Sequence, residues 1–418
     1  MTEIPIARPA PSVSWRLRWA WAATAALGLA ACGGGDGSAG PVAAAPAAPV
    51  PSPPPAAAPA GPPRISTVAS GLAQPWSLAF LPDGRYLVTE KAGRLRVVGN
   101  DGTLVAAAVT GTPAVDAGGQ GGLLDVALAA DFASSRRVYL AYAEPGSGAE
   151  AGRNGLAVGS GVLNAGATAL TQWQVLWRQA PKVASGGHFG GRIVVAPGGL
   201  LYITTGDRQS NAERGKAQDL GQGHGKIVRI RGSDGSVPAD NPFAANSTAQ
   251  PAIWSLGHRN VQGAALHPET GELWATEHGP QGGDELNRVR AGRNHGWPLV
   301  SHGCEYGSPV GNCTPVGGAS TGPGFEPPLS VWGPTSIAPS GLAFYTGNRF
   351  PEWQGQLFMG ALAGQALWRL RLEGTNVVER EALFTDLGER IRDVRQGPDG
   401  WLYLLTDSAN GRLLRVAR

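Results

Sequence analysis

The stretch LAFLPDGRYLVTE at residues 78–90 decides the fold. An apolar run leads into a Pro-Asp-Gly turn, and a second run rich in aromatic and β-branched residues follows, which predicts an antiparallel strand pair. The same phrase recurs along the chain, clearly in some places and in weaker form in others. The clear copies are VVAPGGLLYI at 194–203, ALHPETGELW at 265–274 and VRQGPDGWLY at 394–403, and the weaker ones cover 126–142 and 342–359.

The copies follow one another at intervals of about 50 to 80 residues. One such unit is too exposed to be stable alone, so the units must stack or close into a ring. We therefore predict an all-β fold, a six-bladed β-propeller over residues 64–418. A β-sandwich is the competing architecture, but its turn signals recur at a shorter period. Strands at 402–405 and 413–416 are expected to share a blade with residues 65–68 and so close the ring.

The first 31 residues have the pattern of an export signal. Arg16 and Arg18 precede the apolar run 19–31, which is too short to span a bilayer and is typical of a signal peptide. The run ends in LAAC, which resembles the lipobox of bacterial lipoproteins and makes Cys32 the expected lipidation site. Ordinary cleavage just before Cys32 is the alternative.

Residues 32–63 consist almost entirely of Gly, Ala, Pro and Ser, a composition that predicts a flexible tether and not a folded unit. We therefore expect an exported lipoprotein on the periplasmic side, anchored in the outer membrane. The formal net charge of the chain is +3, and the signal peptide carries +2 of it. No basic block remains, which argues against a nucleic-acid partner. The oligomeric state stays open.

Cys304 and Cys313 lie in a loop rich in Gly and Pro. In an oxidising compartment these two cysteines are expected to pair across the loop. A zinc site is the alternative, but two thiols without a further Cys or His cluster bind zinc poorly.

The stretch SGGHFGGR at 185–192 places His188 among glycines. Glycines allow a ligand to approach the backbone and leave the imidazole uncrowded. Histidine is a natural general base near neutral pH, so this side chain is a candidate for proton abstraction. A hydrogen-bonded structural histidine is the alternative.

Further glycine-rich or charged segments carry amides, guanidiniums and carboxylates. In ERIRD at 389–393, Arg390 and Arg392 share one face because alternate strand residues point the same way; solvated surface charge is the alternative. A pocket with a base, several cations and oxygen donors suits a planar polyanionic cofactor better than a neutral sugar alone. The other segments are GGQGGLL at 118–124, GHRN at 257–260 and EHGPQGGDE at 277–285.

Taken in order, these segments, together with GKIVR at 225–229 and NHGWP at 294–298, resemble the soluble dehydrogenases of sugars that depend on pyrroloquinoline quinone (PQQ). The resemblance runs from about residue 71 to 418 and is specific to the aldose sugar dehydrogenase branch. It implies oxidation of an aldose at C1 to a lactone, with PQQ and Ca²⁺ as cofactors. Electrons would then pass to a quinone or a small soluble acceptor.

The resemblance also implies roles for individual residues. His188 would take the proton of the C1 hydroxyl while hydride passes to the quinone, and Arg259 would stabilise the charge that develops there. Gln120 and Asn260 would hydrogen-bond the reacting region. Arg390 and Arg392 would bind carboxylates of the cofactor, and Asp207 and Asp407 would lie beside it. The main-chain oxygens of Gly279 and Pro280 would bind the active-site Ca²⁺. Glu285 and His295 would belong to a second Ca²⁺ site.

Two positions depart from the family pattern. Ala363 stands where the family has a cofactor-binding lysine, so one cation is missing. Gly187 precedes the histidine where the glucose enzymes have an aspartate, so sugar specificity does not carry over from them. A calcium-dependent lactonase, or a propeller without cofactor that binds a glycan or a protein, are the alternative functions.

Overall fold

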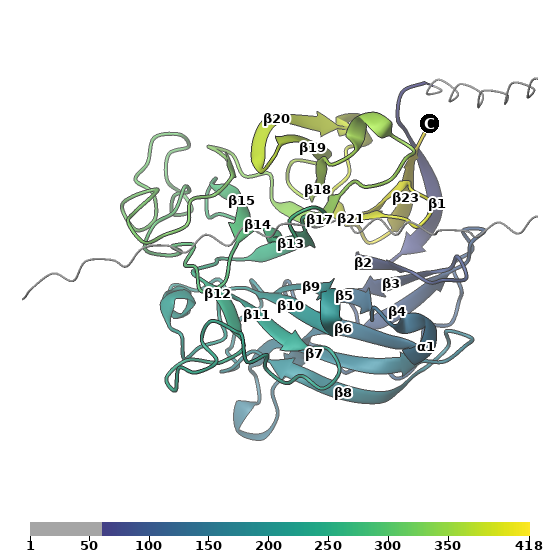
Figure 1. Cartoon of the computed structure of the whole chain (residues 1–418), viewed down its shortest axis with the longest axis horizontal. Coiled ribbons are helices and arrows are strands. Elements are labelled where there is room, and N and C mark those ends of the chain that lie inside the picture. Colours follow the sequence, from purple (N-terminus) through teal and green to yellow (C-terminus); the bar gives the residue numbers. More distant parts are fainter. Residues whose placement is uncertain (1–60) are drawn as a thin grey trace, which may run out of the picture. The chain divides into compact units, whose positions relative to one another are not determined.

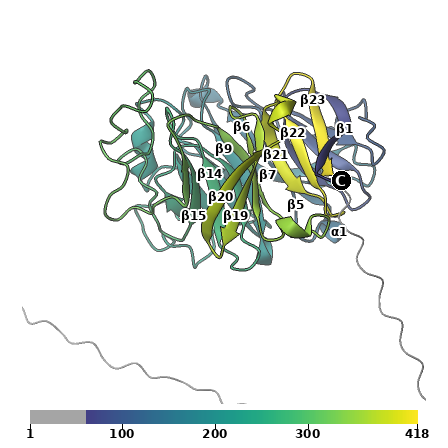
Figure 2. The same cartoon turned by 90° about the horizontal axis from the view of Figure 1, so that it is seen from above.

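The structure, a computed structural model, describes residues 61–418. The signal peptide, Cys32 and all but the last three residues of the tether lie outside this range, so their assignments stay predictions. Within the described range the chain forms a six-bladed β-propeller, which confirms the predicted fold (Figures 1 and 2). The first strand, β1, covers Arg64–Leu72.

Each blade is an antiparallel sheet, and the strand pairs read from the sequence repeats are the two inner strands of the blades. Blade 1 contains β2 (Pro75–Phe80), β3 (Tyr86–Glu90) and β4 (Arg94–Val98). Blade 2 contains β5 (Leu123–Leu128), β6 (Arg137–Pro145), β7 (Asn154–Leu163) and β8 (Leu170–Arg178). Blade 3 contains β9 (Gly190–Ala196), β10 (Leu200–Thr205), β11 (Lys226–Arg231) and β12 (Ile253–Leu256). Blade 4 contains β13 (Val261–Leu266), β14 (Leu273–Glu277), β15 (Asp284–Val289) and β16 (Ser330–Trp332). Blade 5 contains β17 (Pro339–Phe344), β18 (Leu357–Ala361), β19 (Ala366–Glu373) and β20 (Asn376–Leu383). Blade 6 contains β21 (Ile391–Gln396), β22 (Leu402–Thr406) and β23 (Gly411–Ala417), together with β1.

The two ends of the propeller chain close the ring. Strand β1 pairs antiparallel with β23, with Ile65 opposite Val416. Leu413, Leu414 and Val416 of β23 are fully buried, so the closing blade has its own share of the core. The expected pairing of residues 65–68 with the C-terminal strands is confirmed.

The core lies between neighbouring blades. Leu87 of blade 1 and Leu140 of blade 2, for example, are fully buried in one apolar cluster. Helices are short within the described range, and none of them is long and apolar enough to cross a bilayer. They are α1 (Phe132–Ser135) and the 3₁₀ turns Gly148–Glu150, Pro197–Gly199, Arg214–Gln218, Pro351–Trp353 and Thr385–Leu387.

The innermost strands β2, β5, β9, β13, β17 and β21 surround the central channel, each in contact with the next. Because neighbouring strands run antiparallel, the loops that enter these innermost strands lie at the same end as the turns that follow the second strands. Most residues singled out in the sequence lie on these loops and turns. The topology therefore gathers them at one mouth of the channel.

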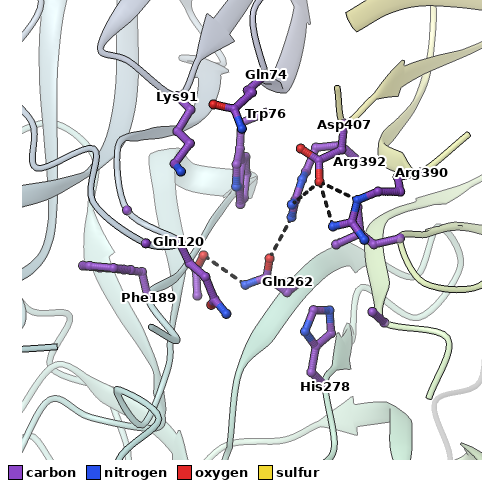
Figure 3. A pocket seen from close by; sticks show the side chains of 15 residues that line it. Gln74, Trp76, Lys91, Gln120, Phe189, Gln262, His278, Arg390, Arg392 and Asp407 are labelled. Atoms are coloured by element: carbon purple, nitrogen blue, oxygen red, sulfur yellow. Dashed lines mark hydrogen bonds and ion pairs between the residues drawn. The ribbon is translucent and has the colours of Figure 1, made fainter. Parts of the chain in front are cut away.

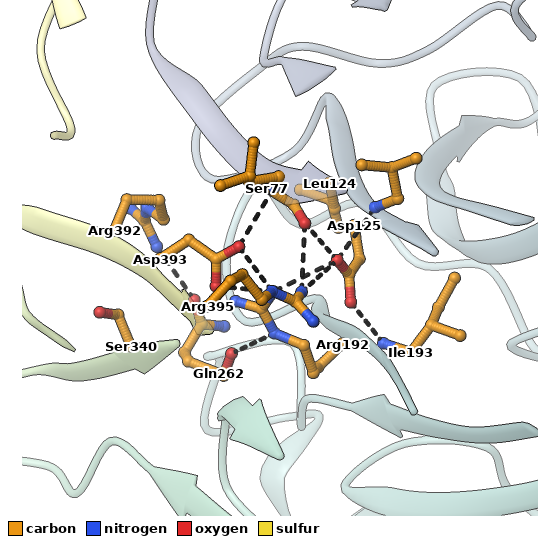
Figure 4. A network of polar contacts seen from close by, with 12 residues as sticks. Ser77, Leu124, Asp125, Arg192, Ile193, Gln262, Ser340, Arg392, Asp393 and Arg395 are labelled. Atoms are coloured by element: carbon orange, nitrogen blue, oxygen red, sulfur yellow. Dashed lines mark hydrogen bonds and ion pairs between the residues drawn. The ribbon is translucent and has the colours of Figure 1, made fainter. Parts of the chain in front are cut away.

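A buried ionic network fills the channel below that mouth (Figure 4). Nη1 of Arg192 lies 3.2 Å from Asp125 and 3.1 Å from Asp393, and Arg395 contacts the same two carboxylates at 2.9 and 3.0 Å. Two cations thus meet two anions, as burial of charge requires. The network separates two cavities of the channel. On strand β2, Trp76 lines the cavity on one side of the network, and Leu78 lines a different cavity on the other side.

Candidate active site

A cavity of about 290 Å³ opens at the mouth of the channel where the loops gather (Figure 3). Its wall combines positive charge, amides and one indole ring. The polar and aromatic side chains that line it are Gln74, Trp76, Lys91, Gln120, Phe189, Gln262, His278, Arg390, Arg392 and Asp407.

The two arginines read from the ERIRD segment meet one carboxylate. Arg390 and Arg392 contact Oδ2 of Asp407 at 2.9 and 3.0 Å, and Arg392 also donates to Oε1 of Gln262 at 3.2 Å. Burial raises the pKa of Asp407, but the two guanidiniums outweigh it and hold this pKa below its usual range. Nε of Arg392 is buried and has no hydrogen-bond partner among residues 61–418. With Lys91, three cations face one anion, so the cavity favours a negatively charged ligand.

His188 lies in the loop between blades 2 and 3, and its Nδ1 is 2.6 Å from Oδ1 of Asp207. The other carboxylate oxygen of Asp207 accepts a hydrogen bond from the Trp297 indole at 2.7 Å. An ionised carboxylate only accepts hydrogen bonds, so Nδ1 of His188 carries the proton and Nε2 keeps its lone pair. This is the tautomer that a general base needs.

Electrostatics keep this imidazole neutral. Burial lowers the pKa of His188, and the positive charge of Arg259 lowers it further, while Asp207 acts in the opposite direction. Burial raises the pKa of Asp207, but its contact with His188 and the charge of Arg259 outweigh this, and the pKa lies below its usual value. At neutral pH the pair is therefore a neutral imidazole on an ionised carboxylate.

The glycines around His188 serve backbone packing. A Cβ at Gly119 would lie 2.3 Å from the Gly186 carbonyl oxygen, and one at Gly206 would lie 2.1 Å from that of His188. Only 3% of His188 is exposed. The expectation that glycines leave the imidazole uncrowded is wrong, because they let loops of neighbouring blades close over it.

The predicted amides connect His188 to the cavity. Oε1 of Gln120, which lines the cavity, accepts a hydrogen bond from the backbone N–H of His188 at 2.9 Å. Oδ1 of Asn260 accepts from Gly190 at 3.3 Å and from Gln262 at 3.1 Å. The structure thus brings Gln120, Asn260, Arg390, Arg392 and Asp407 to one site. Asp207 contacts His188 and does not line the cavity, so its contact with a cofactor stays a prediction.

Arg259 lines a second, small cavity of about 20 Å³, together with Gly279, Pro280, Glu285 and His295. Its Nη1 donates to the carbonyl oxygen of Gly279 at 2.6 Å. The predicted calcium-binding oxygen of Gly279 therefore already accepts a hydrogen bond from a cation. The second-site residues, expected to be separate, lie around the same small cavity.

Two carboxylates stand close together near this cavity. Glu277 and Glu285 are directly opposite on β14 and β15, and Nδ2 of Asn287 donates to both, at 2.9 and 3.0 Å. Burial and then the charge of Glu277 raise the pKa of Glu285 to about 8. A cation beside this pair would relieve their repulsion.

The ring of His295 stacks on His258 at 4.4 Å, and its nitrogens have no hydrogen-bond partner in the described part of the chain. Within that part, no group of three or more His, Cys, Asp or Glu side chains forms a metal site. A metal here would therefore need main-chain or water oxygens in addition to these side chains.

A disulfide joins Cys304 to Cys313. The loop it closes carries Tyr306, whose hydroxyl accepts a hydrogen bond from Nη2 of Arg259 at 3.1 Å. Tyr306 is 64% exposed, so its ring stands at the rim of the site. The disulfide loop thus reaches the residues predicted to react.

Sequence reasoning missed several residues of the cavity wall. Trp76 and Lys91 flank the first repeat at 78–90. No role was given to His278, although it lies in the quoted segment 277–285, or to Gln262, which lies just after the quoted segment 257–260. The signal that finds Lys91 and His278 is their place in the repeat: like Asp407, each follows directly after the second strand of a blade. Ala363 does not line the cavity, but its neighbour Leu362 does.

The sequence model of the family described as Glucose / Sorbosone dehydrogenase matches residues 72–415. The chain is 44% identical over 354 residues to "Aldose sugar dehydrogenase YliI" of Escherichia coli (strain K12), which covers 84% of this chain and 92% of that protein. The crystal structure of the soluble aldose sugar dehydrogenase from Escherichia coli in the apo-form has a TM-score of 0.80 at 43% identity, covering 85% of this chain and 99% of that one. The PQQ-bound form of aldose sugar dehydrogenase from Streptomyces coelicolor has a TM-score of 0.67 at 30% identity, covering 86% and 100%.

Proposed function

Because the chain belongs to the glucose/sorbosone dehydrogenase family, we propose that it oxidises aldoses at C1 to lactones with PQQ and Ca²⁺ as cofactors. The observation that carries the proposal is the His188–Asp207 pair, held next to a cavity with excess positive charge. The solved relative with bound PQQ supports the choice of cofactor.

The cavity wall fits this cofactor. PQQ is a planar ring system that carries carboxylates, so it needs cations around its edge and an apolar surface for its face. Arg390, Arg392 and Lys91 supply the cations, and Nε of Arg392, which has no hydrogen-bond partner among residues 61–418, can donate to an anion. The indole of Trp76 supplies an aromatic surface.

Bound here, PQQ would supply a two-electron acceptor for hydride, and Ca²⁺ a Lewis acid beside it. The sugar loses its C1 hydrogen with the bonding electrons, and its C1 hydroxyl proton moves to Nε2 of His188. Asp207 holds Nδ1–H of His188, so the ring keeps its orientation and the imidazolium that forms is stabilised. Arg259 offers its positive charge to oxygen that becomes negative during hydride transfer.

For calcium, we propose the main-chain oxygens of Gly279 and Pro280, with Glu285 and His295 at a second site. Because Nη1 of Arg259 already occupies the Gly279 oxygen, calcium at this oxygen requires Arg259 to share or release it. The paired carboxylates Glu277 and Glu285 support a bound cation nearby.

The test is reconstitution of the purified protein, freed of metal with a chelator, with PQQ and Ca²⁺. Dye reduction across a panel of aldoses should require both additions and should produce the lactone. Omission of Ca²⁺ tests the metal separately, and replacement of the sugar by lactones tests hydrolysis. Dye reduction without PQQ, or lactone hydrolysis without sugar oxidation, would contradict the proposal.

We also propose that the protein is exported, that residues 1–31 are removed, and that lipidated Cys32 and the tether 32–63 hold it on the periplasmic side of the outer membrane. The Cys304–Cys313 disulfide supports an oxidising compartment. A quinone or a small soluble carrier would then accept the electrons. Mass spectrometry of the mature N-terminus should find a lipid on Cys32, and Cys32→Ala should release the protein into the soluble fraction.

A further inference from the structure

We propose that Lys91 binds a carboxylate of the cofactor, on the side of the cavity away from Arg390 and Arg392. The inference rests on the proposed function. It gives the site a cation on each side, so that a polyanionic ring would be held from two directions.

Lys91 is placed firmly at the cavity. Its backbone N–H donates to the Gln74 carbonyl, and its own carbonyl accepts from Leu123, both at 3.1 Å. At Gly122 a Cβ would lie 2.1 Å from the Lys91 carbonyl oxygen, so only glycine permits this approach. From this fixed backbone the side chain extends into the cavity beside Trp76 and towards Gln120 (Figure 3).

The ammonium group lacks an anionic partner in the described range, whereas the arginines across the cavity share Asp407. The neighbouring carboxylate of Glu90 is already used by Arg94 at 2.6 Å and by Arg96 at 3.3 Å, and it also accepts from the Ala73 N–H. Lys91 thus brings to the cavity wall a positive charge that pairs with no carboxylate of residues 61–418.

The repeat supports the same conclusion. Lys91, His278, Leu362 and Asp407 all follow directly after the second strand of their blades, and all line the cavity. This position therefore faces the ligand in each of these blades. Blade 5 presents the apolar Leu362 there, followed by Ala363, and blade 1 presents a cation. Lys91 can therefore take over the charge that the family pattern places at position 363.

The direct test is the affinity for PQQ, measured by calorimetric titration of the full chain in the presence of Ca²⁺. Lys91→Gln should bind PQQ about tenfold to a hundredfold more weakly, the range for loss of one charge-assisted contact. Its affinity should also depend less steeply on salt than that of the parent. Lys91→Arg should keep most of the affinity. Arg371→Gln removes an exposed charge on the outer part of blade 5 and should change nothing.

Monoesters of PQQ, each with a different carboxylate blocked, locate the contact. One of them should bind equally to the parent and to Lys91→Gln, because the ester removes the group that Lys91 holds. Parental affinity of Lys91→Gln for PQQ, or equal sensitivity of all monoesters to the substitution, would overturn the assignment of Lys91. A parent chain that does not bind PQQ would instead overturn the proposed function.

Discussion

Nδ1 of His188 lies 2.6 Å from Oδ1 of Asp207, and the same carboxylate accepts a hydrogen bond from the Trp297 indole. Three side chains from different blades and loops thus form one chain of contacts. The carboxylate fixes which nitrogen of the imidazole carries the proton. The proposed chemistry depends on this arrangement.

The substitution Asp207→Asn tests whether the chemistry depends on the contact between Asp207 and His188. An asparagine side chain can donate to Nδ1 and so favour the wrong tautomer, and it cannot stabilise an imidazolium. We expect kcat to fall by about 10²- to 10⁴-fold, the contribution of a positioned general base, while PQQ binds with little change. Steady-state assays with parallel PQQ titrations measure both. Asp234→Asn, at an exposed turn, is the control, and an Asp207→Asn variant with parental kcat would remove Asp207 from the mechanism.

The pH profile tests the charge state of His188. The base is active when neutral, so activity should fall as pH drops through the pKa of His188. Because burial and Arg259 lower this pKa, the acid limb of kcat/KM should lie below pH 6.5, the ordinary histidine value. Removing the positive charge with Arg259→Gln should raise the pKa and move the limb to higher pH, whatever activity remains. An acid limb at the same pH in both proteins would contradict this electrostatic account.

Arg390 and Arg392 should contribute unequally to cofactor affinity. The side chain of Arg392 is 14% exposed and that of Arg390 is 45% exposed, so solvent screens Arg390 more. Arg392→Ala should weaken PQQ binding about tenfold to a hundredfold, and Arg390→Ala should weaken it less. Calorimetric titration decides the order, and a larger loss for Arg390→Ala would show that the exposed arginine makes the main contact.

The disulfide should stabilise the fold measurably. Cys304 and Cys313 are nine residues apart, and closing a loop of this size contributes about 2–3 kcal/mol to the free energy of unfolding in the chain-entropy account. The double variant Cys304→Ser, Cys313→Ser should lose about this amount in urea denaturation. A reductant should destabilise the parent similarly and leave the double variant unchanged. Equal stability of the oxidised parent and the double variant would show that the loop is already ordered without the bond.

The fold was accessible from the sequence because its repeat is local. A phrase such as LAFLPDGRYLVTE carries strand, turn and strand within one short window, and recurrence of the phrase implies a ring. The closure of the ring could also be predicted, because residues 65–68 precede the first repeat and were expected to pair with the strands at the C-terminus. The pairing of Ile65 with Val416 shows that they do.

The site could be predicted from the sequence only in part, because a single sequence segment does not show which residues of other blades it contacts. The sequence singled out His188, but nothing near it says that Asp207 and Trp297 form one chain of contacts with it. The glycines around His188 do allow a close approach to the backbone, as expected. The group that approaches is another loop of the protein, not a ligand, and the imidazole of His188 is therefore buried. Lys91 was missed because a lone lysine after a strand carries no motif.

The measurement that tests the central claim most directly is rapid mixing of PQQ-loaded protein with an aldose, monitored by the absorbance of the bound cofactor. In the parent, the sugar should reduce bound PQQ in a single turnover. In His188→Asn, calorimetry should show retained PQQ binding, and reduction should slow by about 10²- to 10⁴-fold. Reduction of bound PQQ at the parental rate in His188→Asn would contradict the claim that this histidine removes the proton.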